Sequence, residues 1–248
     1  MISDPRPQGT RTSGSTDIKV IFFDAAGTLF RVRGSVGEIY AHAARSFGVI
    51  ADPVRLQQSF VSAFRAASAR GLPKASGLDL ERAERLWWMS VVQRAFGVDM
   101  PDRILPEYFD MVFELFRRAE AWVLYPDCRE TLEGLRERGY RLGVLSNFDS
   151  RLYDVLANLG IEALFEQVFI SWRIGVAKPD PLIFRAALKA MGIAPCRSLH
   201  VGDSAAEDIE GALNVGMHAV LLDRSGSQHP PHGAASIREL SELCPLLQ

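Results

Sequence analysis

Four groups of residues along this chain have types that could bind an anionic group and carry out a displacement on it. They are Asp24-Ala25-Ala26-Gly27-Thr28-Leu29, Ser146-Asn147, Lys178-Pro179 and Gly202-Asp203-Ser204, the last followed by Asp208. A carboxylate can act as a nucleophile that divides one displacement into two easier ones. A hydroxyl can hydrogen-bond an anionic oxygen, and an ammonium group can neutralise developing negative charge. These types suit chemistry at an anionic centre, provided that the fold brings them together.

The groups follow or border short apolar runs that have the length of buried strands. The runs are residues 18–23, 141–145, 167–170, 198–201 and 218–222. Helical patterns near 127–138, 150–159, 181–191 and 205–215 separate them, and this alternation indicates a parallel sheet with right-handed crossovers. In open α/β sheets, ligands bind beyond the carboxyl ends of the strands. We therefore expect the site at that edge of the sheet.

The pattern changes between residues 34 and 124, where apolar residues recur at helical spacing and no strand-like run occurs. Asp52-Pro53 has the residue types of a helix start. Two apolar stripes follow it, and such stripes usually pack in a core. They are Leu86, Met89, Val92 and Phe96, and then Leu105, Phe109, Val112, Phe113 and Phe116. We expect a flexible tail over 1–17, an α/β core over 18–33 and 125–248, and an all-helical cap over 34–124.

The overall composition narrows the class of partner. The 248 residues have a formal charge of −2, with 48% hydrophobic and 23% charged residues, which is typical of a globular protein. A non-specific nucleic-acid binder needs surplus Lys and Arg, so the expected partner is a small molecule. The first 17 residues lack the apolar region of a secretory signal, and no long apolar run occurs elsewhere. Together with three cysteines in no metal-binding spacing, these features predict a cytoplasmic protein without membrane contact.

In their order and placement, the four groups resemble the motifs of the haloacid dehalogenase superfamily of phosphatases and related hydrolases, over residues 18 to about 225. The segment Gly34-Ser35-Val36-Gly37-Glu38-Ile39-Tyr40 and the pair Trp87-Trp88 are similar to the subgroup known as haloacid dehalogenase-like hydrolase domain-containing protein 3. The resemblance implies a three-layer, Rossmann-like α/β core with a parallel sheet and an inserted helical cap.

The resemblance also implies roles for the residues of the motifs. Asp24 would be the nucleophile that forms an aspartyl-phosphate, with Ser146 and Lys178 assisting as catalytic residues. Thr28 and Asn147 would bind the phosphate. The expected substrate is therefore a small phosphorylated molecule.

A magnesium ion is the implied cofactor, because dense negative charge on a phosphate and a carboxylate needs a cation with oxygen ligands. By the resemblance, its ligands are Asp24, the backbone carbonyl of Ala26, and Asp203. Asp208 would orient waters or the lysine, although Ser204 and Asp208 equally suit the start of a helix.

Ala26 departs from the common phosphatase pattern, which has a second aspartate two residues after the nucleophile. That aspartate protonates the leaving group and then activates water, and such acid–base catalysis contributes about 10²- to 10⁴-fold. We therefore expect a Mg²⁺-dependent phosphohydrolase that is slow, or that acts on acyl or aryl phosphates whose leaving group needs no protonation. A cap residue could supply the missing acid, and Glu38, Tyr40 and His42 are the candidates.

Three other functions stay open. Haloacid dehalogenases resemble the chain less, because their motif after the fourth strand lacks the aspartate that Asp203 retains. Phosphonatases do have Ala at this position and use a cap lysine as a Schiff base, for which Lys74 in the loop Gly71–Gly77 is the one lysine of the insert. A phosphate-binding regulatory module is the third alternative.

The cap and the hinge that leads into it also hold residues that could face the substrate. Adjacent helix positions do not share a face, so at most one of Trp87 and Trp88 should line the cleft. Arg31 and Arg33 could contact an anionic substrate or lie in solvent. His200, in an apolar strand, is expected to be a core residue.

Overall fold

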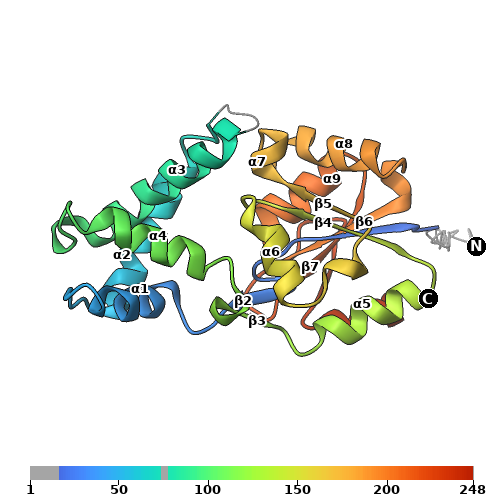
Figure 1. Cartoon of the computed structure of the whole chain (residues 1–248). Coiled ribbons are helices and arrows are strands. Elements are labelled where there is room, and N and C mark those ends of the chain that lie inside the picture. The colour runs from blue at the N-terminus through green and yellow to red at the C-terminus, as the bar shows by residue number, and fades with distance from the viewer. Residues whose placement is uncertain (1–16, 74–77, 248) are drawn as a thin grey trace, which may run out of the picture.

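A six-stranded sheet in the order β5-β4-β1-β6-β7-β8 forms the centre of the larger body in the computed structural model (Figure 1). The structure describes residues 17–73 and 78–247. Every pair of neighbouring strands is parallel. The strands are β1 Val20–Phe23, β4 Arg141–Ser146, β5 Gln167–Ile170, β6 Ser198–Gly202, β7 His218–Leu222 and β8 Ala235–Ile237. The chain builds outward from β1 on one side and then on the other, so a ligand crevice is expected at the end of β1.

Helices cover both faces of this sheet because its strands are apolar on both sides. Val20 and Phe22 of β1 pack on one face with α8 and α9, and Ile21 and Phe23 pack on the other with α5 and α6. The core helices are α5 Cys128–Glu137, α6 Arg151–Asn158, α7 Ser171–Ile174, α8 Pro181–Ala190, α9 Gly211–Asn214 and α10 Leu243–Leu246, with the π-helical turn η5 Ala205–Glu210. This arrangement confirms the predicted three-layer α/β core.

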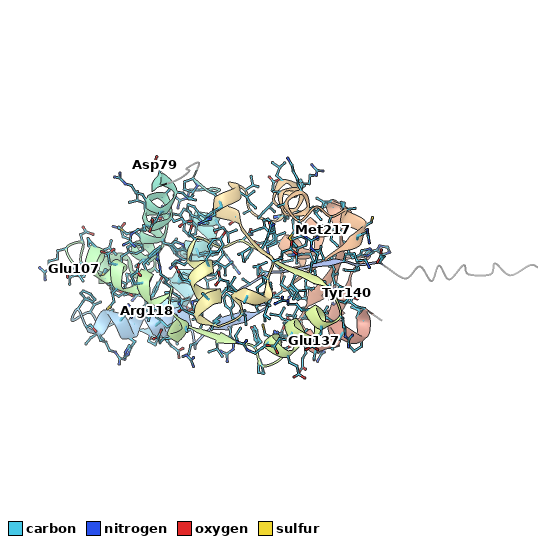
Figure 2. The ribbon with its side chains drawn as sticks, turned by 45° about the vertical axis from the view of Figure 1, so that its right-hand side comes forward. Asp79, Glu107, Arg118, Glu137, Tyr140 and Met217 are labelled. Carbon is cyan, nitrogen blue, oxygen red and sulfur yellow. The ribbon has the colours of Figure 1, made fainter. Side chains whose placement is uncertain are left out.

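The inserted cap forms a second body beside the carboxyl edge of the sheet. Its helices are α1 Val36–Arg45, α2 Pro53–Ser68, α3 Leu78–Phe96 and α4 Leu105–Leu115. Asp52 caps α2 by accepting from the amides of Val54 and Arg55, as the Asp-Pro pair predicts. Figure 2 shows the labelled Asp79 and Glu107 on this body, and Tyr140 and Met217 at the far end of the larger one. Figure 1 shows the four cap helices on one side and the sheet on the other.

The two chain segments that connect the cap to the larger body lie side by side. β2 Phe30–Val32 and β3 Trp122–Leu124 form an antiparallel pair. Arg33 donates to the carbonyls of Glu120 and Trp122, and so joins the outgoing strand to the returning one. The connection is therefore a two-stranded ribbon.

Three local expectations were wrong. Residues 122–124 form a strand rather than part of an all-helical cap, because they pair with β2. Leu86 is 55% exposed instead of packing with its stripe, because the turn of α3 around Glu84 and Trp88 faces the larger body. The strand β8 was missed, since its three residues contain no apolar run. The tail predicted over 1–17 lies outside the described residues except for Asp17.

Other expectations were confirmed. The five predicted strands are present, and the second cap stripe, from Leu105 to Phe116, is buried throughout. Among the described residues, none of the helices combines the length and apolar character needed to cross a membrane.

Candidate active site

Three of the candidate residues leave the sheet at the same edge. β1 pairs in register with both β4 and β6, and all three strands run in one direction. Asp24 directly follows β1, Ser146 ends β4, and Asp203 directly follows β6. The sheet thus delivers two carboxylates and a hydroxyl to the mouth of the expected crevice.

Lys178 lies at the centre of the charged groups. Its Nζ donates to Asp24 Oδ1 at 2.6 Å, to Asp208 Oδ1 at 2.5 Å and to the Leu145 carbonyl at 2.9 Å. Ser146 Oγ donates to the same oxygen of Asp24 at 2.9 Å. The lysine side chain is 1% exposed, so these contacts lie where electrostatic interactions are stronger than in water. The structure therefore brings together Asp24, Ser146 and Lys178.

Burial and neighbouring charge fix the protonation of this cluster. Burial raises the pKa of Asp24, against the lowering effect of the Lys178 ammonium. Burial alone would lower the pKa of Lys178, but Asp208 and Asp24 raise it above its ordinary value. Burial likewise opposes ionisation of Asp208, yet Lys178 and His200 bring its pKa below the ordinary value. The lysine is thus a cation, and Asp208 an anion, at neutral pH.

Asp208 is anchored on several sides. Burial lowers the pKa of His200, so its ring is neutral and donates from Nε2 to Asp208 Oδ1 at 2.9 Å. The Ser204 amide donates to Asp208 Oδ2 at 3.0 Å. Gly202 leaves room for the carboxylate, which a Cβ there would overlap. Asp208 therefore positions the lysine, and His200 is a buried core residue that supports it.

Asp203 completes a group of carboxylates that suits a metal ion. Asp24, Asp203 and Asp208 each offer an oxygen, and these oxygens lie within 4.8 Å of one another. Gly27, with a φ of +99°, is needed beside Asp203, because a Cβ there would overlap the carboxylate. Burial and the charges of Asp24 and Asp208 raise the pKa of Asp203 to about 7. A cation bound by these oxygens would relieve this repulsion.

Asn147 braces the loop that carries the lysine. Its Nδ2 donates to the Lys178 carbonyl at 3.0 Å and to Glu207 Oε2 at 2.9 Å, and its Oδ1 accepts from the Lys178 amide at 2.7 Å. Thr28 is fully buried, and its hydroxyl approaches Asp203 Oδ1 at 3.5 Å. The predicted phosphate contacts of Asn147 and Thr28 stay predictions, and of the two only Asn147 lines the cavity described next.

A cavity of about 1040 Å³ opens between the sheet edge and the cap. The core side of the cavity contributes Asp24, Ala26, Ser146, Asn147, Lys178 and Asp203, and the cap side contributes the rings of Tyr40, Phe60, Phe64, Trp87, Trp88 and Phe116. Both Trp87 and Trp88 line it, which contradicts the expectation of at most one. Trp87 packs on Trp172 and the Trp88 indole donates to Asp149, and both of these partners also line the cavity.

Of the other candidates in the cap and the hinge, only some lie at the cavity. Of the three possible replacement acids, Tyr40 lines the cavity, whereas Glu38 closes a capping box with Ser35 and His42 is exposed. Burial raises the pKa of Tyr40, so it stays protonated. Arg31 and Arg33 donate to backbone carbonyls of the ribbon. Lys74, the phosphonatase candidate, lies outside the described residues.

Comparison with known proteins decides the family. A family model described as haloacid dehalogenase-like hydrolase matches residues 18–216. The chain belongs to this hydrolase family. The hydrolase is 38% identical over 207 residues to the mouse haloacid dehalogenase-like hydrolase domain-containing protein 3, and this match covers 83% of the chain and 82% of the relative. The human protein of the same name is 36% identical over 208 residues, with the same shares covered.

Solved structures agree with this assignment. A haloacid dehalogenase-type (HAD) phosphatase from Thermococcus onnurineus is 25% identical, with a TM-score of 0.64 over 93% of the hydrolase and 98% of that chain. The L-2-haloacid dehalogenase from Xanthobacter autotrophicus is 19% identical, with a TM-score of 0.68 over the same shares. The second likeness shows the shared fold alone.

Sequence reasoning missed the contacts that join the cap of this hydrolase to its core. Glu84 accepts from the amide and hydroxyl of Ser150 at 3.1 and 2.8 Å. The indole of Trp88 donates to Asp149 Oδ2 at 2.6 Å, and Arg151 forms two further hydrogen bonds to the same carboxylate, at 2.9 and 2.6 Å. The available signal was the run Asp149-Ser150-Arg151, which begins two residues beyond Asn147 and places polar groups near the same strand end.

Proposed function

We propose that this hydrolase is a Mg²⁺-dependent phosphohydrolase that acts through an aspartyl-phosphate on Asp24 and favours phosphates with good leaving groups. One observation carries the proposal: Ser146 and Lys178 both donate to Oδ1 of Asp24. This pairing leaves Oδ2 as the oxygen available for attack on phosphorus. A buried carboxylate held in one orientation by two donors has the placement that a nucleophile requires.

In the proposed first step, Asp24 Oδ2 bonds to phosphorus and the leaving-group oxygen departs with the electron pair of the P–O bond. Lys178 and Ser146 then lie beside the charge that develops on the phosphoryl oxygens. In the second step water attacks phosphorus, the Asp24 carboxylate leaves with its electron pair, and the proton released by water passes to solvent. Asp208 keeps the lysine in place during both steps.

The proposed metal ligands are the carboxylates of Asp24 and Asp203 and the carbonyl of Ala26. Asp208 is less suitable, because Lys178, His200 and the Ser204 amide already donate to it. Carboxylate and carbonyl oxygens suit Mg²⁺, and the raised pKa of Asp203 reflects negative charge that a cation would balance. When bound, Mg²⁺ would neutralise charge on the phosphoryl group.

Ala26 supports the selectivity part of the proposal. The residue is exposed and lines the cavity, so its methyl group stands where the common pattern has an acid. A methyl group cannot protonate a leaving alkoxide. Phenolates and carboxylates leave more readily without a proton, which favours aryl and acyl phosphates.

The experiment is phosphate release from p-nitrophenyl phosphate and acetyl phosphate, with Mg²⁺ and with a chelator in its place. Asp24→Asn is measured in parallel, with Asp79→Asn as a matched control because Asp79 is an exposed cap residue. We expect turnover that requires both Mg²⁺ and Asp24 and is unchanged in the control. Absence of turnover on both substrates, or equal turnover in Asp24→Asn, would overturn the proposal.

A further inference from the structure

The cavity has two chemically different ends. Its core end carries the charged groups of the proposed reaction, whereas its outer end is lined by aromatic rings from both bodies. All four tryptophans of the chain line this one cavity. They are Trp87 and Trp88 on α3, Trp122 on β3, and Trp172 on α7.

The rings at the outer end contact one another across the cleft. Trp87 packs edge-on against Trp172 of the larger body, with ring centroids 5.8 Å apart. Phe64 packs against both Trp87 and Trp88 at 5.7 Å. Phe64, Trp87 and Trp88 are all half-buried, so parts of their surfaces stay available to a ligand. This arrangement, which we name the aromatic box (Phe64, Trp87, Trp88 and Trp172), suits a flat apolar group.

Within the described part of the chain, the cavity offers no free cation for a second anionic group. The cationic side chains among its described lining residues are Lys178 and Arg151. Lys178 is paired with two carboxylates. Arg151 is paired with Asp149 at 2.6 Å, is 7% exposed, and lies against the ring of Trp88. Among these described lining residues, a carboxylate or second phosphate on the substrate finds no unpaired cation, and desolvating an anion without a partner is costly.

We infer that the substrate is an aryl phosphate whose leaving group is an uncharged, apolar ring system seated in the aromatic box. This inference rests on the proposed phosphohydrolase function and adds the class of leaving group. Two independent features agree on it: the box accepts a flat ring, and the methyl group of Ala26 suits a phenolate, which needs no proton to depart. The cavity volume of about 1040 Å³ is large enough for a leaving group of two or more fused rings.

The first test compares aryl phosphates whose phenol leaving groups have similar acidity, so that differences in rate do not arise from leaving-group ability. Phenyl, 2-naphthyl and 3-carboxyphenyl phosphate form the series, with glucose 6-phosphate as a polar alkyl phosphate. We expect kcat/KM for 2-naphthyl phosphate to exceed that for phenyl phosphate about tenfold and that for 3-carboxyphenyl phosphate about a hundredfold. Equal values, or a preference for the carboxylated ring or the sugar, would overturn the inference.

A pair of matched variants tests the box itself. Phe64→Ala removes one wall, and Phe47→Ala removes a half-buried cap ring that packs on Tyr108 outside the cavity. We expect Phe64→Ala to lower kcat/KM for 2-naphthyl phosphate about tenfold, mainly through KM, and so to lower the ratio of kcat/KM between 2-naphthyl phosphate and glucose 6-phosphate. Phe47→Ala should leave the ratio between substrates unchanged. An unchanged ratio in Phe64→Ala would contradict the role of the box.

Binding without turnover separates this inference from the proposed function. Because all four tryptophans line the cavity, their fluorescence reports on occupancy, and the probes are phenylphosphonate and methylphosphonate, which have no scissile ester. We expect phenylphosphonate to bind at least tenfold more tightly. If it does and no aryl phosphate is hydrolysed, the phosphohydrolase function fails while the aromatic preference stands. If hydrolysis depends on Asp24 but shows no aromatic preference, the inference alone fails.

Discussion

The core end of the cavity is held by hydrogen bonds to carboxylate oxygens at 2.5 to 2.9 Å, whereas the outer end, which we also call the cap end, is held by ring contacts with centroids 5.0 to 5.8 Å apart. Hydrogen bonds between buried charges are directional and tolerate little displacement. Apolar contacts are non-directional and depend on the area buried. The two ends therefore differ in what they can tolerate: the core end fixes one arrangement of its charged groups, and the cap end can accept changes of shape.

The largest expected effect follows from removing the cation at the core end. Lys178→Met leaves Asp24 and Asp208 buried beside each other without a counterion, and breaking such a pair costs about 3–5 kcal/mol of unfolding free energy. We also expect turnover to fall by at least about 10³-fold. Chemical unfolding and phosphate release measure the two effects. Lys189→Met, at the exposed end of α8, is the matched control, and comparable losses in both variants would contradict the role of Lys178.

Adding an acid at the core end should change which leaving groups are accepted. Ala26→Asp places a carboxyl group at an exposed position in the cavity, and general acid catalysis contributes about 10²-fold or more. We expect kcat/KM for glucose 6-phosphate to rise by about that factor and the value for 2-naphthyl phosphate to change little. A uniform change on both substrates would argue against the leaving-group explanation.

The surplus of carboxylates at the core end should make the metal-free protein less stable as pH rises. The pKa of Asp203 is about 7 in the folded chain against an ordinary 3.8, chiefly because of burial and then the charges of Asp24 and Asp208. Between these values the folded state keeps a proton that the unfolded state releases, so stability present near pH 4 is lost towards pH 7 and above. Thermal unfolding with a chelator should show the decline, and excess Mg²⁺ should reduce it. A flat profile with the chelator would show that repulsion among these carboxylates does not limit stability.

The control for this profile is Asp203→Asn, which removes the titrating group. Its thermal midpoint should vary less with pH between about 4 and 7 than that of the unaltered chain, and Mg²⁺ should no longer raise it at the upper end. An undiminished slope in this variant would assign the titration to another residue.

The smallest expected effect concerns the polar contact of the aromatic box. Trp88→Phe keeps an apolar ring and removes the hydrogen bond from the indole to Asp149. Hydrogen bonds to charged groups contribute about 1.5–3 kcal/mol, so we expect a loss of unfolding free energy in that range, measured in urea. Substrate preference should persist. If the loss of substrate preference, expressed as a free energy, exceeded the loss of unfolding free energy, the hydrogen bond rather than the ring would confer selectivity.

Much of the core end could be predicted from sequence, because a parallel sheet leaves little freedom in where its strands end. Asp24, Ser146 and Asp203 each border an apolar run, and the register of β1 with β4 and β6 brings them together. Of the partners of Asp208, the lysine was expected, whereas His200 could not be foreseen in the same way. The contact between Asp208 and His200 depends on the path of the π-helical turn η5, and a sequence pattern does not distinguish this turn from an ordinary helix.

The cap end could not be predicted, because aromatic residues at helical spacing usually pack in a core, and the pattern does not mark the few that line a cavity. Phe109 and Phe64 illustrate this: both lie on cap helices, yet Phe109 is 1% exposed in the cap core and Phe64 lines the cavity. The packing of α3 across the cleft decides the difference. Trp172, on a four-residue helix of the larger body, joins the box only through that packing.

The ribbon of β2 and β3 makes the cap a separable insertion in the α/β core. Because the cap leaves and rejoins the chain through adjacent antiparallel strands, its two ends lie next to each other, which is the arrangement in which inserted domains are best tolerated. A cap of another length or helix number could be grafted onto the same ribbon without shifting the register of the parallel sheet. Evolution, or a protein engineer, could thus exchange the cap as one unit while the sheet and the residues at its strand ends stay unchanged.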